Sequence, residues 1–371
     1  MNRFSESTGR VIDAHVHMGA LDRLDRLDAV REELGFERIN LVCTAFRQLI
    51  NVNHNACVAK ASRPDAYSIF LGLDHTAWWS DGAVKAPPLV EQVDRLRALG
   101  ADGIKMLESI PQVHKDIPEP LNGPYYAGYF ARVAEVDLPL LWHVGNPPEF
   151  WDADAIPQWA KGLGWLYDDS FPTNGPLRAQ AEAVLDRHPS LKVIFPHFYF
   201  HSTELPRAAR LFERFPNVCF DLALGIELCF NLSVDPDASR AFFSRFADRI
   251  VFGTDIMTGQ TVEQACVRAH IIRRFLETEE VFRVPPDADG WLGPGEGGEI
   301  VGLSLPADVL EKIYAGNFLR LVGEAIAPLE IPLAIEECRR VAGILATRDG
   351  VDPDQTEPGR AAGKLEELAS A

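Results

Sequence analysis

Eight short apolar segments, separated by stretches with the periodicity of amphipathic helices, constrain the fold of this chain most. Most of these segments are hydrophobic on both faces, which is typical of parallel strands buried on both sides. Helix-period stretches such as 89–100 and 176–189 lie between them. No glycine-rich nucleotide-binding motif follows a strand, and the alternation favours an α/β fold of the (β/α)8 TIM-barrel type over an open doubly wound sheet. The expected strands are residues 10–18, 39–46, 66–74, 103–107, 138–144, 191–198, 218–224 and 249–255.

The composition is typical of a cytoplasmic globular protein. The 371 residues are 47% hydrophobic, and the formal net charge of −18 argues against nucleic acid or an anionic membrane surface as the main partner. No stretch approaches the ~18 apolar residues of a membrane helix, and residues 1–10 lack the apolar core of a secretory signal. The six scattered cysteines contain no C-x-x-C pair and are expected to be free thiols. We expect a small molecule as partner and a homodimer, the commonest assembly.

Three long connections follow the third, fourth and fifth expected strands. In a barrel they lie at the C-terminal ends of the strands, where active sites are built, and long loops there are more often lids or pocket walls than plain linkers. Their tryptophans would either line an apolar pocket or pack the insertions against the barrel. The connections are residues 78–88, 107–126 and 145–175, and the tryptophans are Trp78, Trp79, Trp151, Trp159 and Trp165.

The end of the chain is expected to lie outside the barrel. A Gly- and Pro-rich insertion, residues 281–306, precedes the last helix-like stretch of the barrel. We expect a barrel domain over residues 1–328, which carries all the candidate site residues. Residues 329–371 would form a C-terminal helical extension that ends in a loosely held tail.

The first expected strand carries two histidines two residues apart, His15 and His17, with Asp13 just before them. Side chains alternate between the faces of a strand, so all three point to the same side. If that side is the protein interior, burying three titratable groups has a free-energy cost that needs a partner. A metal ion would satisfy two neutral imidazoles at once, which makes this segment a candidate metal site.

Four further polar residues interrupt or close other apolar segments. Lys105 lies in the fourth segment, His143 in the fifth, His197 in the sixth and Asp255 at the end of the eighth. A single histidine at a strand end is more often structural, and Asp255 alone could cap the next helix. Active-site groups of a barrel stand at the C-terminal ends of its strands, however, so the conjunction of these residues on different strands indicates one shared site.

Five segments, taken in order, resemble the amidohydrolase superfamily. They resemble most closely the amidohydrolase-related branch, which also contains aminocarboxymuconate-semialdehyde decarboxylase and its relatives. The resemblance extends over residues 10–323 and includes the closing helix-like stretch 309–323. It implies a TIM barrel that binds a divalent metal ion, most often zinc. The segments are DAHVHMG (13–19), GIKML (103–107), LLWHVGNP (140–147), VIFPHF (193–198) and VFGTD (251–255).

The resemblance implies roles for the residues at the strand ends. His15, His17, His143 and Asp255 correspond to the metal ligands, and His197 corresponds to a histidine that acts on the bound water or the substrate. The chemistry of the donors agrees with this assignment. Three imidazoles and one carboxylate leave room on a zinc ion for water, whose pKa could fall towards ~7. Asp255 could also accept a proton from that water, and His197 could polarise or reprotonate the reacting group.

Lys105 has two alternative roles. In binuclear members of the superfamily the corresponding lysine is carboxylated and bridges two metal ions, with His143 and His197 on the second ion. The local sequence GIKMLES lacks the histidine and proline that usually follow in the related branch, so we favour one metal ion and an unmodified lysine. A buried lysine would have a lowered pKa and would pair with a substrate carboxylate or, alternatively, with a neighbour such as Asp13.

Residues near the rim are weaker candidates. Glu149, Trp151 and Asp152 follow His143 closely, and His201 lies just beyond the sixth strand. Each could contact a substrate. For the two carboxylates, exposure to solvent in a lid is the simpler interpretation.

Taken together, these residues predict a metal-dependent enzyme. The favoured reaction is hydrolysis, in which metal-activated water attacks a carbonyl-like centre of a small, aromatic or carboxylated substrate while Asp255 and His197 transfer protons. The alternative is a non-oxidative decarboxylase that uses the same mononuclear site. A catalytically silent metal-binding barrel is the third alternative. The intact acid–base pair of His197 and Asp255 argues against it, because a structural zinc site is normally closed by four protein ligands and has no base nearby.

Overall fold

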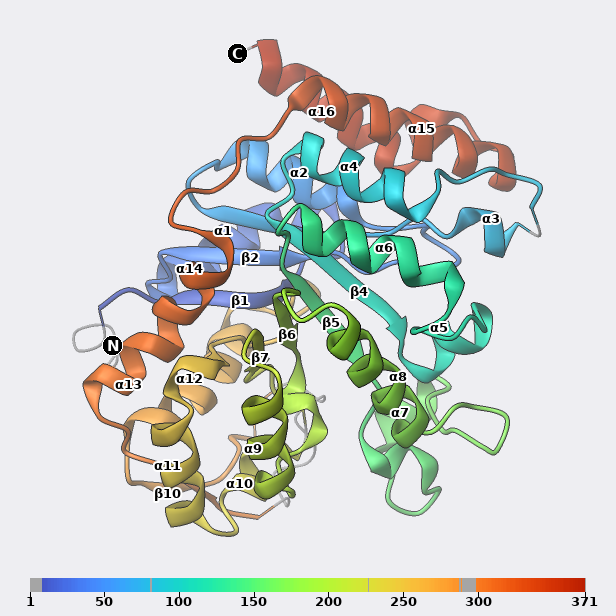
Figure 1. Cartoon of the computed structure of the whole chain (residues 1–371). Coiled ribbons are helices and arrows are strands. Elements are labelled where there is room, and N and C mark those ends of the chain that lie inside the picture. Colours follow the sequence, from blue (N-terminus) through green and yellow to red (C-terminus); the bar gives the residue numbers. More distant parts are fainter. Residues whose placement is uncertain (1–8, 81, 226, 287, 289–297, 371) are drawn as a thin grey trace.

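The computed structural model describes residues 9–80, 82–225, 227–286, 288 and 298–370. Eight parallel strands lie side by side in chain order and curl into a barrel (Figure 1). A short ninth strand, β9 (Ile256–Met257), pairs with the first strand, and the N–H of Ala14 donates to the carbonyl of Phe252, which closes the sheet. The predicted TIM barrel and its eight strands are therefore confirmed. They are β1 (Ile12–His17), β2 (Arg38–Val42), β3 (Tyr67–Gly72), β4 (Gly103–Ser109), β5 (Leu140–Val144), β6 (Val193–Phe195), β7 (Val218–Asp221) and β8 (Ile250–Val251).

Helices alternate with the strands and cover the outside of the barrel (Figure 1). The helix after β9 begins with a capping box, in which the side chains of Thr261 and Gln264 each accept the other residue's backbone N–H. The larger helices are α1 (Leu24–Leu34), α2 (Asn53–Ser62), α4 (Leu89–Leu99), α6 (Pro124–Glu135), α8 (Asn174–Arg187), α9 (Leu205–Arg214), α11 (Pro236–Arg245) and α12 (Val262–Glu277). Shorter ones are α3 (Thr76–Trp79), α5 (Pro111–Asp116), α7 (Gln158–Gly162), α10 (Leu228–Leu232), α13 (Ala307–Glu311) and α14 (Asn317–Val322).

Apolar side chains fill the N-terminal end of the barrel interior. Ile12 and Ala14 of β1 belong to this cluster together with apolar residues of six other strands. Helix α14 closes it from below, with Phe318 stacked on Phe70 of β3 at 6.0 Å between ring centroids. The polar residues of the strands are therefore left to meet at the C-terminal end.

Most strands end earlier than the apolar pattern predicts, and for two of them this changes the setting of a site residue, since β6 stops at Phe195 and β8 at Val251. His197 and Asp255 follow them with φ of 56° and 59°, a left-handed conformation that costs non-glycine residues roughly 1–2 kcal/mol. Hydrogen bonds hold both turns, since the N–H of His197 donates to Asp221 (2.9 Å) and that of Asp255 to the carbonyl of His15 (2.8 Å). Strained backbone of this kind is typical of functional sites.

The insertions lie where the sequence places them. Those after β3, β4 and β5 contain α3, α5 and α7 at the C-terminal end of the barrel. The fourth insertion forms the antiparallel pair β10 (Val281–Phe282) and β11 (Ile300–Val301), while its residues 287 and 289–297 lie outside the described residues.

The expectation of a loosely held tail is wrong. After α15 (Ile331–Asp349) the chain forms α16 (Glu357–Ser370), which packs against α15 and α2 (Figure 1). Ala361, Ala362 and Leu365 are fully buried there, and Glu357 accepts the N–H of Leu21 at 3.1 Å. The packing face consists mainly of alanine and glycine, which permit close approach but give little hydrophobic signal in the sequence. The proposed domain boundary after residue 328 stays a prediction.

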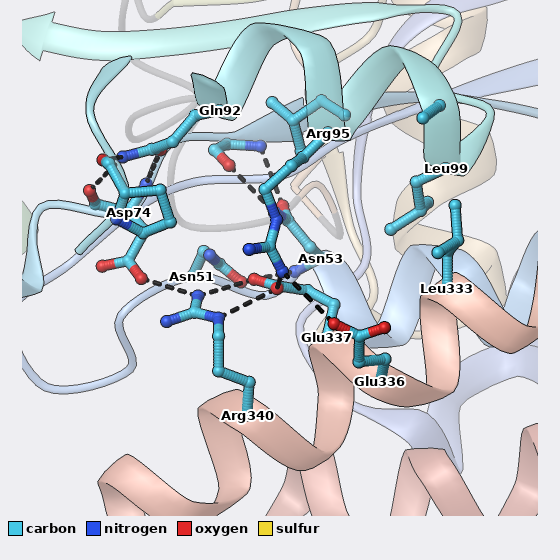
Figure 2. Close-up of a pocket in the computed structure, with 14 residues that line it drawn as sticks. Asn51, Asn53, Asp74, Gln92, Arg95, Leu99, Leu333, Glu336, Glu337 and Arg340 are labelled. Atoms are coloured by element: carbon cyan, nitrogen blue, oxygen red, sulfur yellow. Dashed lines mark hydrogen bonds and ion pairs between the residues drawn. The ribbon is translucent and has the colours of Figure 1, made fainter. Parts of the chain in front are cut away.

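Helix α15 is also fixed to the barrel. Figure 2 shows Arg340 of α15 between Asp74, which follows β3, and Glu337. The guanidinium donates to Asp74 at 2.7 Å and to Glu337 at 2.6 Å, and Asp74 is only 5% exposed. The C-terminal extension therefore contacts the end of the barrel that carries the candidate site.

Three expectations from composition have different outcomes. All six cysteines are free and buried, as predicted. Among the helices in the described part of the chain, none combines the length and apolar character needed to cross a bilayer. Residues 1–8, most of the segment expected to lack a secretory signal, lie outside the described residues.

Leu365→Ala tests whether α16 belongs to the folded core. The substitution leaves a cavity at a fully buried position, so we expect the free energy of unfolding to fall by about 2–4 kcal/mol in urea denaturation. Glu367→Ala, an exposed position two residues away, should change it by less than about 0.5 kcal/mol. An equal free energy of unfolding for the two variants would indicate that residues 357–370 are not part of the folded core.

Candidate metal centre

Three predicted ligands meet at the C-terminal end of the barrel. Nε2 of His15 lies 3.1 Å from Nε2 of His17, and Oδ1 of Asp255 lies 3.6 Å and 3.2 Å from these two nitrogens. The two histidines come from β1 and Asp255 from the turn between β8 and β9. The closure of the barrel therefore brings together residues 240 positions apart.

The donor atoms fit a divalent metal ion. His15 is fully buried, and its pKa is held well below the usual value by burial and by the charge of Lys105, so its imidazole is neutral. Nδ1 lies 2.8 Å from Oδ2 of Asp221, which is an acceptor, so the proton is on Nδ1 and the lone pair of Nε2 faces His17 and Asp255. Ligands about 2.1 Å from one ion lie about 3.0–3.4 Å apart, close to the observed separations.

Asp221 is a functional residue that the sequence analysis missed. At the end of β7, it accepts hydrogen bonds from the His15 imidazole, from the N–H of His197 (2.9 Å) and from the N–H of Ala223 (3.0 Å). Burial raises its pKa to about 6, against the opposing effect of His197 and these N–H donors. A single aspartate inside the apolar segment 218–224 was the available signal.

His197 and His143 lie beside the three ligands. Nδ1 of His197 lies 3.1 Å from the carbonyl of Ala223, so it carries the proton and Nε2 is left for the site. The His143 ring on β5 lies 4.8 Å from that of His197, and its Nε2 is buried with no hydrogen-bond partner among the described residues. Burial lowers the pKa of both imidazoles. His143 is not in the compact group of three, and its role as a fourth ligand stays a prediction.

Lys105 of β4 places a buried cation at the same point. Its Nζ lies 3.4 Å from Nε2 of His15, and the residue is 2% exposed. Burial lowers the pKa of its ammonium group to about 8, although Asp221, Asp255 and Glu108 oppose the shift. Asp13, the alternative partner, is bound elsewhere, since its carboxylate accepts from the hydroxyl of Thr254 (2.5 Å) and from backbone N–H groups.

A cavity of about 590 Å³ opens above these residues. Its floor is polar and is formed by His17, Lys105, His143, His197 and Asp255. Its walls contain aromatic side chains from the connections after β2, β3 and β5 and from the turn after β6, which are Phe46, Trp79, Phe150, Trp159, Trp165 and Phe200. The end of β4 and the connection after it add the aliphatic residues Leu107, Ile110 and Val113. Polar and charged side chains also line the walls, among them Arg47, Gln48, Gln112 and Asp116. A ligand in this cavity would have its polar end at the candidate metal site.

The weaker candidates lie away from the cavity. The described residues that line the cavity do not include Glu149, Trp151, Asp152 or His201. Trp151 packs on Tyr167 at 4.8 Å between centroids, and the Asp152 carboxylate accepts the N–H of Asp154 in an exposed turn. His201 is 1% exposed and packs edge-on against Tyr199. The tryptophans divide between the two expected roles, because Trp79, Trp159 and Trp165 line the cavity while Trp78 packs against Tyr125.

A TIM barrel with two histidines on its first strand and an aspartate after its eighth, all directed at one buried point, defines a class of metal-dependent barrel enzymes. Within this class, the amidohydrolase family model (Amidohydro_2) matches residues 12–323, and the chain belongs to this family. The resemblance noted in the sequence is thereby confirmed.

Solved structures with a similar fold cover about 85% of this chain. An uncharacterized TIM-barrel protein from Bordetella bronchiseptica aligns with a TM-score of 0.52 and 16% identity over 85% of this chain and 99% of its own. A 2,6-dihydroxybenzoate decarboxylase complexed with 2,6-dihydroxybenzoate aligns with a TM-score of 0.51 and 17% identity over 85% of this chain and 98% of its own. The 5-carboxyvanillate decarboxylase from Sphingomonas paucimobilis aligns with a TM-score of 0.50 and 12% identity over 84% of this chain and 98% of its own. At these identities the similarity concerns the fold. A search of curated protein sequences finds no significant match.

Asp221→Asn tests the orientation of the first ligand. The amide keeps the shape of the side chain but removes the charge that holds the His15 proton on Nδ1, so we expect the metal affinity to fall about 10–100-fold. The measurement is competition with a chromophoric chelator. Asp248→Asn, at an exposed aspartate before β8, is the matched control and should leave the affinity unchanged. Equal affinity of the two variants would contradict the orienting role.

Proposed function

We propose that this protein is a metal-dependent, non-oxidative decarboxylase that releases the carboxyl group of a small organic acid as carbon dioxide. The observation that carries this proposal is the buried Lys105 ammonium group beside the donor atoms of His15, at the base of a cavity whose walls contain aromatic side chains. A substrate carboxylate that reaches the floor would pair with Lys105 there, while Arg47, whose guanidinium donates to the Trp79 carbonyl, is a further cation of the cavity lining. The apolar side chains of the walls would exclude the water that stabilises the carboxylate in solution.

The order of the two candidate reactions is thus the reverse of that favoured by the sequence. Two similar solved structures, of 2,6-dihydroxybenzoate decarboxylase and 5-carboxyvanillate decarboxylase, support the change, since both act on aromatic acids. The apolar walls of the cavity are suited to a planar substrate of the same kind.

The proposed roles follow from the positions of the side chains. His15, His17 and Asp255, with His143 as a fourth ligand, would hold one divalent ion, which when bound supplies Lewis-acid polarisation of the reacting group. We propose zinc, although a shell of histidine and carboxylate also accepts manganese, iron or cobalt. Lys105, unmodified, would pair with the carboxylate. The bond to the carboxyl carbon breaks, carbon dioxide leaves, and the electron pair remains on the substrate carbon. That carbon would then take a proton that originates in solvent water, which Nε2 of His197 or the Asp255 carboxylate would first accept and then pass on.

Hydrolysis is the second candidate, and the state of Asp255 favours it. Although burial opposes ionisation, the imidazoles of His17, His15 and His197 hold the pKa of Asp255 well below its usual value. Asp255 is therefore a carboxylate at neutral pH and could accept a proton from an attacking water.

Product analysis in heavy water separates the two reactions. With carboxylated aromatic compounds, we expect one carbon dioxide per product and one deuterium on the carbon that lost it, and no turnover after the metal is removed. His197→Ala and Asp255→Asn should each lower kcat about 100-fold or more, as loss of a proton-transfer group does. His201→Ala should not. Cleavage of an amide or ester without release of carbon dioxide would establish hydrolysis instead. Full activity of His197→Ala and Asp255→Asn would contradict the proton-transfer roles proposed for these two residues.

Lys105→Met tests the pairing with the substrate carboxylate. A hydrogen bond to a charged group contributes about 1.5–3 kcal/mol, so we expect KM for the acid to rise by roughly 10–100-fold. Elemental analysis should give an unchanged metal content, and the intact mass of the wild type should show no added carboxyl group. Lys115→Met removes a rim lysine that does not line the cavity and is the matched control. A lysine that bridges two metal ions would instead cause loss of metal in Lys105→Met.

A further inference from the structure

The cavity is much larger than its polar floor requires. Its volume is about 590 Å³, whereas a cavity of ~150 Å³ is enough to hold benzene. A single-ring acid bound at Lys105 would therefore leave most of the space above it empty.

One wall of this outer space is a preformed aromatic surface. Phe150, Trp159 and Trp165, all from the connection after β5, lie 5.7–6.0 Å apart between ring centroids and line the cavity. They belong to a hydrophobic cluster that the connection forms by itself. The N–H of Tyr167 donates to the carbonyl of Phe150 (2.8 Å), and the Asn146 amide donates to the Tyr167 hydroxyl (2.7 Å). The wall is therefore built without a ligand and needs little ordering on binding.

A second wall comes from the connections after β2 and β3. Phe46 and Trp79 line it, and Arg47 donates to the carbonyl of Trp79 at 3.2 Å. Phe46, Trp79, Trp159 and Trp165 are all only partly buried, so apolar ring surface on both walls remains in contact with water. Leu163 extends this surface to the mouth of the cavity and is 51% exposed. Apolar surface that faces inward in a concave site, from two sides, is the signature of a site for a flat apolar group.

We propose that these residues form an outer subsite for a second aromatic ring, or a comparably flat apolar group, joined to the part of the substrate that carries the carboxyl group. The substrate class is therefore an acid of at least two rings, with its carboxylate at Lys105 and its far ring between Trp79 and Trp165. The placement of the carboxylate rests on the proposed function; the outer subsite rests on the cavity itself.

Two probe acids test the subsite by isothermal titration calorimetry on the metal-loaded protein. Biphenyl-4-carboxylate should bind at least about tenfold more tightly than benzoate, because its second ring buries apolar surface on the outer walls. Leu163→Ser should reduce this advantage several-fold and leave benzoate unaffected. Leu166→Ser is the matched control, because Leu166 is 40% exposed in the same connection but is not among the described residues that line the cavity.

Trp165→Ala should abolish the tighter binding of biphenyl-4-carboxylate over benzoate. Near-UV circular dichroism checks that the connection after β5 stays folded in this variant. If the connection unfolds, Leu163→Ser still tests the subsite, because Leu163 is exposed. Equal affinity for the two acids in the wild type, or equal effects of Leu163→Ser and Leu166→Ser, would overturn the proposal. The assay is independent of turnover. Tighter binding of the two-ring acid without carbon dioxide release from any acid would support the subsite and reject the proposed decarboxylase. Carbon dioxide release from single-ring acids, with equal affinity for the two probe acids, would support the decarboxylase and reject the subsite.

Discussion

The hydrogen bonds of Asp221 are the interaction on which the site depends. One carboxylate, fully buried at the end of β7, accepts from the ring of His15 and from the backbone N–H groups of His197 and Ala223. It thereby fixes the tautomer of a ligand on β1 and the start of the left-handed turn that carries His197. A buried carboxylate without partners would be costly, and these three donors offset that cost. The orientation of the candidate metal ligand His15 is thus set by Asp221, which is not itself a candidate ligand.

Charge is distributed unevenly in the cavity, and this asymmetry defines its chemistry. Burial lowers the pKa of His15, His143 and His197, while Lys105 and Asp255 are charged neighbours of the His15 imidazole. The walls combine aromatic and aliphatic side chains with a few polar ones. In the function proposed above, binding and reaction would be separated along the depth of the cavity, because the floor would bind the charged reacting group and the walls would contact the part of the substrate attached to it.

Much of the fold and the core of the site could be predicted from the sequence, because both depend on local patterns. Apolar segments mark the strands, and a polar residue that closes such a segment must lie at one end of the barrel. His15, His17 and Asp255 met as expected for this reason. Lys105 and His197 line the same cavity, and the roles assigned to them stay predictions.

What the sequence did not reveal depends on contacts between distant segments. Asp221 was one polar residue inside an expected apolar strand, and nothing near it in the sequence showed its role, because its partner on β1 is 206 positions away. The role of each tryptophan depends on how the connection after β5 folds on itself, which has no periodic signal. The last helix, α16, packs through Ala361 and Ala362, whose small side chains look neutral in a hydrophobicity pattern.

The contacts of α15 with the barrel have a consequence for how such a protein can change. Arg340 holds Asp74 at the end of β3, and Arg348 donates to the carbonyl of Arg47, next to Phe46 in the cavity wall. The two connections that form one wall of the cavity are thus supported from behind by the end of the chain. Insertions, deletions or fusions that displace α15 are therefore expected to disturb the two connections, although none of the described residues that line the cavity belongs to this helix. The shape of the cavity would then depend on a helix that a ligand never touches.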